Sequence, residues 1–331
     1  VRINRRRAIT VLAAAAGLPL IWQASQAQAA RLHRWEGTTL GAPSTIQLYH
    51  PDADKARAAI AASLDELARL ESIFSVYRAD SALSQLNRDG HLEDAPVELV
   101  ELLGHAKELA RLSDGVYDPT IQPVWQLYMR HFTQAQVDPA GPSRADLDQA
   151  LALVDWRGVE IDAAARSIRL ARPGMAVTLN SGAQGYITDK VADVLRAHGF
   201  DRVLVDMGEQ RALAAKPDGS AWRIGIANPA DPTRALTELS VVDKAVSTSG
   251  GYGTLFDEAG QFTHLIDPRT GRTAPALLGV TVVADTATRA DGLSTALLLT
   301  PPEKRQALLR AAGAEQAIVV TPDGVVATYT A

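Results

Sequence analysis

The chain has 331 residues, of which 47% are hydrophobic and 21% are charged, and its formal net charge is -5. This composition indicates a folded globular protein with a sizeable core rather than a disordered chain. The mild acidity, and the lack of a dense Lys/Arg cluster beyond the first residues, argue against a nucleic-acid partner. The chain contains no cysteine, which excludes disulfides, thiolate metal sites and a lipid-modified cysteine anchor.

The first residues have the pattern of an export signal. The paired Arg5 and Arg6 precede an Ala/Leu-rich run over residues 8–22, and small residues follow it. This run of about 15 residues is shorter than the roughly 20 needed to span a bilayer. The paired arginines are typical of a twin-arginine signal, and an ordinary Sec signal is the alternative. We expect residues 1–29 to be removed, leaving 30–331 as one domain in the periplasm.

Hydrophobic periodicity predicts helices and strands in mixed order. Helical spacing of apolar residues predicts helices over 53–74, 96–112, 144–154 and 185–200. Alternating and short apolar runs predict strands over 44–50, 202–207, 222–227, 244–248, 261–266 and 279–284, a hairpin over 159–179, and a helix, a strand and a hairpin over 289–330. Helices mixed with hairpins indicate an α+β fold with largely antiparallel sheets. A two-lobed arrangement of the roughly 300 residues is the alternative to one domain.

Common nucleotide, zinc-protease and esterase signatures, such as G-x-G-x-x-G and H-E-x-x-H, are missing from the sequence. Polar residues instead form four islands, each at the edge of an apolar element. These are YDPT (117–120), NSGAQGY (180–186), STSGGYG (247–253) with THLIDPRTG (263–271), and RADGLSTALL (289–298).

The last island has the spacing of a metal site. Asp291 and Thr295 are four residues apart, so on a helix their oxygens share one face and suit a hard cation such as Mg²⁺. The alternative is a capping box, because Thr288 precedes Asp291 by three residues. The NSGAQGY island could direct its backbone N–H groups at an anion, or it could be a tight turn without a ligand.

His264 lies in the third island, between an apolar run and a turn. A two-residue alternation places Phe262, His264 and Ile266 on one side of a predicted strand, which favours a packed core histidine. Asp267 and the turn that follows it could instead aim polar atoms into a cleft. The residues alone leave both interpretations open.

Taken in order, the islands resemble the ApbE family of FAD:protein FMN transferases. The resemblance is carried by FSVYRADSALSQLN, DGVYDPTIQPVW, NSGAQGYITD, STSGGYG, THLIDPRTG and ADGLSTALLL, and it extends from about residue 35 to the end of the chain. It implies an ApbE-like, T-fold-like architecture and an exported enzyme with FAD as substrate. The implied reaction is Mg²⁺-dependent transfer of FMN from FAD to a Ser or Thr hydroxyl of a client flavoprotein, with release of AMP.

The resemblance also assigns roles to residues. Asp291, Thr295 and the main-chain oxygen of Ser181 match the metal ligands, and His264 matches the histidine to which we give the general-base role. Asp267 is expected to orient the turn or to reach the water shell of the metal. The positions that match flavin contacts are Leu40, Tyr77, Val116, Tyr117, Asp118, Thr178, Gln184 and Ile266.

Several positions depart from the family pattern. Leu40-Gly41-Ala42 stands where Met-Gly-Thr is usual, Thr178 where Asp is frequent, Gln184 where Lys or Glu is frequent, and Gly208-Glu209-Gln210 where Gly-Gly-Asp is usual. The departures leave Asp291, Thr295 and His264 intact. We therefore expect them to affect nucleotide binding more than the chemistry. They suggest a subgroup devoted to one client, such as a membrane-bound electron-transfer flavoprotein.

Two other functions would use the same residues. One is a magnesium-dependent FAD pyrophosphatase, in which water replaces the client hydroxyl and free FMN and AMP are formed. The other is a non-catalytic periplasmic carrier that holds FAD for delivery.

Overall fold

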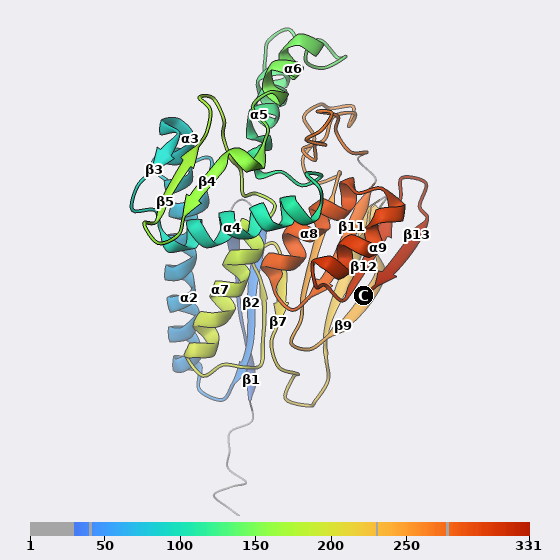
Figure 1. The fold of residues 1–331 in the computed structure, drawn as a ribbon. Coiled ribbons are helices and arrows are strands. Elements are labelled where there is room, and N and C mark those ends of the chain that lie inside the picture. The colour runs from blue at the N-terminus through green and yellow to red at the C-terminus, as the bar shows by residue number, and fades with distance from the viewer. Residues whose placement is uncertain (1–29, 40–41, 230, 276–277) are drawn as a thin grey trace, which may run out of the picture.

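The computed structural model describes residues 30–39, 42–229, 231–275 and 278–331 (Figure 1). The expected signal segment, residues 1–29, and the expected flavin contact Leu40 lie outside the described residues. Among the helices of the described part of the chain, none combines the length and apolarity needed to cross a bilayer.

An eight-stranded antiparallel sheet forms the centre of the molecule. Its strands, in spatial order, are β1 (Arg31–Thr39), β2 (Ala42–His50), β6 (Val203–Asp206), β7 (Gln210–Ala212), β10 (Ala245–Gly250), β11 (Gly279–Ala284), β12 (Gln316–Val320) and β13 (Val326–Thr330). Both faces of the sheet are buried at its central strands, as β6 illustrates: Val203 and Val205 pack into the main core, whereas Leu204 packs into a second cluster on the opposite face. Such strands read as continuous apolar runs.

Helices cover one face of this sheet, as Figure 1 shows for α2, α7 and α8. The helices are α2 (Ala53–Phe74), α3 (Ala82–Asp89), α4 (Val97–Leu112), α5 (Gln122–Phe132), α6 (Arg144–Leu151), α7 (Ala183–Ala197), α8 (Ala287–Leu299) and α9 (Pro302–Ala311), with short 3₁₀ turns η1 (Pro119–Ile121) and η2 (Trp156–Gly158). The bounds predicted for α2 are confirmed. It begins where the Asp52 side chain accepts hydrogen bonds from the backbone N–H groups of Asp54 and Lys55.

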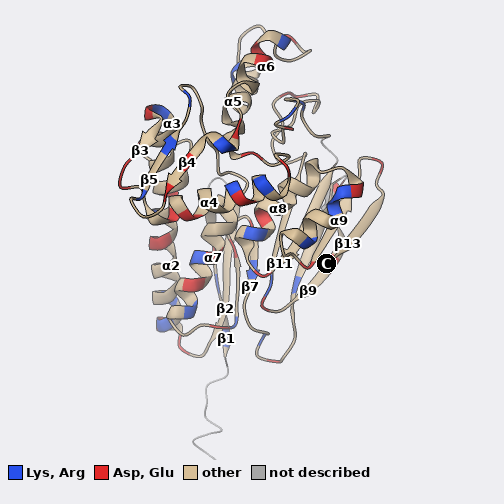
Figure 2. Ribbon diagram, in the orientation of Figure 1, with Lys and Arg blue, Asp and Glu red and all other residues tan. Residues whose placement is uncertain are grey.

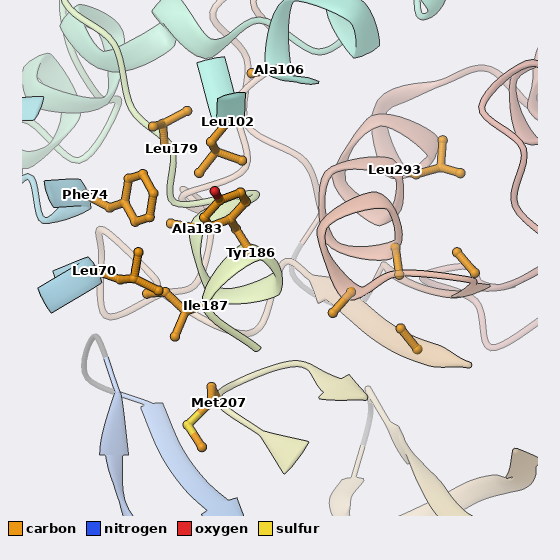
Figure 3. Close-up of a cluster of buried hydrophobic side chains, with 14 of the residues drawn as sticks. Leu70, Phe74, Leu102, Ala106, Leu179, Ala183, Tyr186, Ile187, Met207 and Leu293 are labelled. Carbon is orange, nitrogen blue, oxygen red and sulfur yellow. The ribbon is translucent and has the colours of Figure 1, made fainter. Parts of the chain in front are cut away.

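The main core lies between these helices and the sheet. Figure 3 shows Leu70 and Phe74 of α2 directed toward Tyr186 and Ile187 of α7. The Phe74 and Tyr186 rings meet edge to face, with centroids 5.4 Å apart. Leu102 of α4 joins the same cluster, so α4 closes this core from above α2 and α7.

The opposite face of the sheet is covered by a long hairpin, β8 (Trp222–Asn228) and β9 (Asp231–Val241). Trp222, Ile224 and Ile226 alternate along β8 and pack with apolar residues of the central sheet. A small sheet, β3 (His91–Leu92), β5 (Ser167–Leu170) and β4 (Val159–Asp162), lies beside the main body. The structure is therefore α+β with antiparallel sheets, as predicted.

A satellite core forms around α5, apart from the main core. Val124 and Tyr128 of α5 pack with Phe256 and Ile266, which belong to the segment between β10 and β11. In Figure 1, α5 and α6 project from one end of the molecule beside the loops of this segment. This arrangement brings α5 next to the residues around His264.

Several sequence predictions differ from the structure. The strand expected over 261–266 is wrong, because this segment makes only isolated bridges at Thr263 and Ile266. The hairpin expected over 159–179 is formed by β4 and β5, and residues 171–179 beyond β5 are irregular. Proline and glycine at positions 173 and 174 interrupt the strand pattern there.

Charged residues of both signs are interspersed along the helices (Figure 2). Many form exposed pairs within one helix, such as Arg111 with Glu108 and Arg196 with Asp193. Exposed pairs of this kind contribute little to stability, because solvent and salt screen them.

Candidate functional site

One cavity, of about 240 Å³, gathers most of the residues expected to carry the chemistry. Its lining includes His264, Ser181, Asp291, Thr295, Val116, Tyr117, Asp118, Thr178, Gln184 and Ile266. These residues come from four segments that are widely separated in the sequence. Their convergence is the first structural indication that the polar islands form one site.

Helix α8 supplies the predicted pair of oxygen groups. Asp291 and Thr295 lie one turn apart on this helix and both line the cavity. The Thr295 hydroxyl shares a hydrogen bond of 2.9 Å with the Ser249 hydroxyl. The alternative interpretation of Asp291 as part of a capping box with Thr288 is wrong, because the helix is capped by Thr286, whose side chain accepts from the Arg289 N–H.

Helices α7 and α8 hold each other's first turns. The Asp291 Oδ2 accepts a hydrogen bond of 3.0 Å from the backbone N–H of Gly185. Conversely, the carboxylate of Asp189 on α7 accepts from the backbone N–H groups of Ala287 and Thr288 at the start of α8. These reciprocal bonds fix the start of α7, including Ser181 just before it, relative to Asp291.

The Ser181 carbonyl lies where α7 begins, next to Tyr117. The Tyr117 hydroxyl is 3.4 Å from this carbonyl oxygen, to which it donates, and it accepts a hydrogen bond of 3.3 Å from the Ser181 hydroxyl. Burial raises the pKa of Tyr117, so its hydroxyl stays protonated and can donate. The backbone oxygen expected to complete a metal site is thus held in place at the cavity wall.

Two buried carboxylates lie in the cavity wall, and only one of them, Asp291, was expected to have a role in the site. Asp291 is 4% exposed and Glu209 is 7% exposed. Burial raises the pKa of Asp291 to about 7, and the charge of Asp189 adds to the increase. Burial, together with the charge of Asp291, raises the pKa of Glu209 well above its usual range. No spacing pattern marks Glu209, because it lies in the turn between β6 and β7.

The cavity has an excess of acidic side chains. Asp118, Glu209 and Asp291 line it, and none of the described residues that line it is Lys or Arg. Closely spaced buried carboxylates destabilise one another unless they are protonated or neutralised by a cation. The donor set of carboxylate, hydroxyl and carbonyl oxygens is the kind that Mg²⁺ and Ca²⁺ prefer.

His264 lies at the end of a short hairpin over residues 254–264, which we call the histidine hairpin. The backbone N–H of Phe256 donates to the Phe262 carbonyl over 2.8 Å, and that of His264 donates to the Thr254 carbonyl over 3.0 Å. The imidazole lines the cavity and is half-buried, so the interpretation of His264 as a packed core residue is wrong. The turn at 257–261, together with Phe256 and Phe262, directs the imidazole toward the cavity.

The imidazole is oriented through Nδ1. When protonated, this atom donates to the Thr254 carbonyl oxygen at 3.0 Å, and when unprotonated it accepts from the Thr254 backbone N–H at 3.2 Å. In the tautomer that donates Nδ1–H to this carbonyl, Nε2 keeps a free lone pair and can accept a proton. Burial lowers the pKa of His264, and the bond to Thr254 opposes the decrease. The neutral, basic form therefore predominates at neutral pH.

The expected flavin contacts on the loop before α5 occupy one wall. Tyr117 and Val116 are buried, and their neighbour Asp118 is largely engaged within the protein. The Asp118 carboxylate accepts from the Thr120 backbone and hydroxyl and from the Trp156 backbone N–H. Asp118 thus fixes the shape of this wall.

The remaining expected flavin contacts surround the other side of the cavity. Thr178 and Gln184 flank the start of α7, and Ile266 follows the histidine hairpin. The Gln184 side chain lies against Gly208, where φ is +100° and an added Cβ would meet the Gln184 amide at 2.5 Å. Gln184 therefore needs glycine at position 208 to hold its place in the wall.

Two of the expected site residues that the structure describes are not part of this lining. Tyr77 follows α2 and is 72% exposed. Asp267 pairs with Arg269 in the turn after Ile266, and the backbone N–H of Arg269 also donates to its carboxylate. Asp267 thus orients the turn, which is one of the two roles expected for it. Leu40 lies outside the described residues.

A larger cavity of about 590 Å³ lies on the other side of α8, between α4 and α7. Tyr117 and Ser181 line both cavities, but Asp291, Thr295 and His264 line only the smaller one. The smaller cavity is therefore the candidate site, because of these two cavities only the smaller one joins the Asp291 and Thr295 pair to His264.

Comparisons with known proteins place the chain in a family. The model of the ApbE family matches residues 40–319. The FAD:protein FMN transferase of Treponema pallidum is 32% identical over 291 residues, which cover 80% of this chain and 79% of that protein. The crystal structure of the Pseudomonas stutzeri flavinyl transferase ApbE in its apo form is 30% identical with a TM-score of 0.75, covering 91% of this chain and 96% of that one. The Vibrio cholerae flavin transferase ApbE is 26% identical with a TM-score of 0.76, covering 91% and 97%.

Proposed function

Because this chain belongs to the ApbE family, we propose that it transfers FMN from FAD to a hydroxyl group of a client protein. The observation that carries the proposal is the shared cavity of Asp291, Thr295, Ser181 and His264. The names of the relatives support a flavin transferase in particular. Release of AMP and a Ser or Thr acceptor are the finer parts of the proposal.

The residues of the cavity fit a divalent cation. Asp291, Thr295 and the Ser181 carbonyl would hold Mg²⁺, and the acidic lining without Lys or Arg favours a cation over a bare anion. When bound, the ion neutralises the pyrophosphate oxygens of FAD and acts as a Lewis acid. An acidic cavity could not otherwise accept a negatively charged dinucleotide without a large repulsion.

The chemistry assigned to this chain's own residues is proton removal and positioning. The client hydroxyl oxygen attacks the phosphorus on the riboflavin side, and His264 Nε2 accepts its proton. The bond from that phosphorus to the bridging oxygen breaks, and AMP leaves with this oxygen. The Thr254 carbonyl holds Nδ1–H, which directs the lone pair of Nε2 at the incoming hydroxyl.

Export to the periplasm is part of the proposal and rests on the twin-arginine pattern before residue 30. We propose a client flavoprotein with a Ser or Thr acceptor, such as a membrane-bound electron-transfer protein. Departures at Thr178 and Gln184, both in the cavity wall, are consistent with a subgroup adapted to one client.

A single incubation separates the proposed transferase from its alternatives. Purified protein is mixed with FAD, Mg²⁺ and a co-expressed client, and products are followed by intact mass and by chromatography of free nucleotides. A client mass gain of one FMN moiety, with an equal amount of AMP, is the expected result. Free FMN and AMP without labelled client would indicate a pyrophosphatase, and unchanged bound FAD would indicate a carrier.

A further inference from the structure

We propose that Tyr128 of α5 is a positioning residue for His264, acting by clamping the histidine hairpin against the satellite core. The inference rests on the proposed function, in which His264 accepts the client proton. It assigns a part in catalysis to α5, which otherwise only lines one side of the cavity through Trp125.

The hydroxyl of Tyr128 ties α5 to the segment that follows the histidine hairpin. It donates a hydrogen bond of 2.8 Å to the Gly271 carbonyl. Gly271 ends the turn that starts at Asp267, and its φ of +72° is one that L side chains rarely adopt. Tyr128 is 4% exposed, so this bond is shielded from competing water.

The ring of Tyr128 holds the hairpin itself. It stacks on Phe256 with centroids 5.3 Å apart and an interplanar angle of 14°. It also contacts Phe262, with centroids 5.7 Å apart. Phe256 and Phe262 are opposite each other in the hairpin, so one tyrosine side chain touches both of its strands.

The clamped pair and the imidazole share one face of the hairpin. Thr254 pairs with His264 two residues along the hairpin from the pair of Phe256 and Phe262. Side chains two residues apart point to the same side of a strand. The position of the phenylalanine pair therefore sets the distance between the Thr254 carbonyl and the imidazole Nδ1. If the hairpin shifts, the bond from Nδ1–H to the Thr254 carbonyl lengthens.

The turn at Gly271 gives the clamp a second anchor. An added Cβ at Gly271 would lie 2.6 Å from the Leu147 side chain of α6, so α6 packs directly on this turn. The backbone of Ala274 in turn donates to the Leu265 carbonyl, next to His264. Tyr128 thus supports His264 in two ways. It packs on Phe256 and Phe262 of the histidine hairpin, and it bonds to the turn at Gly271 that follows His264 in the chain.

The variant Tyr128→Phe tests the inference, because it removes the hydroxyl and keeps the ring stack. We expect kcat for FMN transfer to fall about 3- to 10-fold, as for the loss of one shielded hydrogen bond, with KM for FAD unchanged. Nitrogen NMR of the histidine side chains should show His264 shifting toward the tautomer protonated on Nε2. The acid limb of the pH–rate profile should shift with it.

Tyr49→Phe is the matched control, because Tyr49 packs on Trp222 in the layer behind the sheet, away from the cavity. It should leave kcat and the His264 signals at wild-type values. A Tyr128→Phe protein with wild-type kcat and unchanged His264 signals would overturn the inference, and so would an effect confined to KM. Full transfer by His264→Ala would separately refute the general-base role of His264, and the NMR readout would then still show whether Tyr128 positions the imidazole.

Discussion

Among single residues, His264 carries the proton transfer in the proposed reaction, and its substitution gives the sharpest test. We expect His264→Ala to lower the rate of FMN transfer by roughly 10²- to 10⁴-fold, the range typical of a lost general base. FAD binding, measured by flavin fluorescence, should persist because the rest of the cavity is intact. His198→Ala, after the end of α7, is the control. Undiminished FMN attachment to the client would refute the assignment.

Asp291 makes cation binding depend on pH. Its pKa is raised to about 7 by burial, so below that pH its carboxyl holds a proton that a metal ion must displace. We predict that the apparent dissociation constant for Mg²⁺ rises on acidification below pH 7, approaching about tenfold per pH unit. Isothermal titration calorimetry between pH 5.5 and about 8 measures it. A dissociation constant independent of pH would argue against Asp291 as a ligand.

The sequence predicted the site residues whose proximity follows from their spacing along a helix. It missed one site residue whose position follows from the strand pairing. Asp291 and Thr295 could be found because four residues make one helical turn. Glu209 could not, because its proximity to Asp291 results from the pairing of β7 with β10 beneath α8. No local pattern distinguishes a buried carboxylate of this kind from an ordinary turn residue.

Among the elements, α7 and α8 approach closely at one glycine. A Cβ at Gly185 would lie 2.4 Å from the Ala287 carbonyl oxygen and 2.8 Å from the Asp291 Cβ. Gly185→Ala must therefore push the helices apart, and we expect a loss of about 1–3 kcal/mol in the free energy of unfolding. Because the displaced helices carry Ser181 and Asp291, Mg²⁺ affinity should fall as well. Denaturant unfolding and calorimetry check the two effects.

Gly104 of α4 provides the control for this substitution. An added Cβ there would meet nothing within 4 Å, and the residue is helical. Gly104→Ala should therefore stabilise the protein by about 0.5–1 kcal/mol through helix propensity and leave Mg²⁺ affinity unchanged. If the two variants changed stability in the same direction, close packing of α7 on α8 would not be the cause.

Helices and strands were predicted correctly where the apolar residues follow a single helical or strand period. The prediction was wrong where aromatic contacts between distant segments determine the conformation. The helix over 53–74 was predicted with its bounds, because apolar residues recur along it at helical spacing, and the structure adds the Asp52 cap. The strand expected over 261–266 is instead one arm of the histidine hairpin, whose conformation depends on Phe256 and Phe262 packing against α5. Tertiary contacts of this kind leave no signal in local alternation.

For the whole molecule, the sequence predicted the α+β class and the four segments of the site, but not how the layers assemble. The second layer behind the sheet, β8 and β9, packs on residues such as Leu204 and Val283, which alternate with core residues of the opposite face. When a strand is a continuous apolar run, its sequence does not indicate which residues face the helices and which face the β8–β9 hairpin.

The buried acids should also affect global stability. Burial raises the pKa values of Asp291 and Glu209 in the folded state, so folding favours their protonated forms. The metal-free protein should therefore lose stability as the pH rises from about 4 to 7, because the unfolded chain releases these protons earlier. Thermal melts in a chelator measure the trend, and Mg²⁺ should restore stability above pH 7. Asp291→Asn should flatten the pH dependence, and an unchanged slope would contradict this account.

The outward side of the histidine hairpin offers a practical handle. Leu255 is 44% exposed and lies one residue from Thr254, and the chain contains no thiol. A Leu255→Cys protein would thus accept a fluorophore or a spin label at a single position, within a few residues of the imidazole. The spectrum of such a label would show in real time whether the arm becomes ordered when dinucleotide or client arrives.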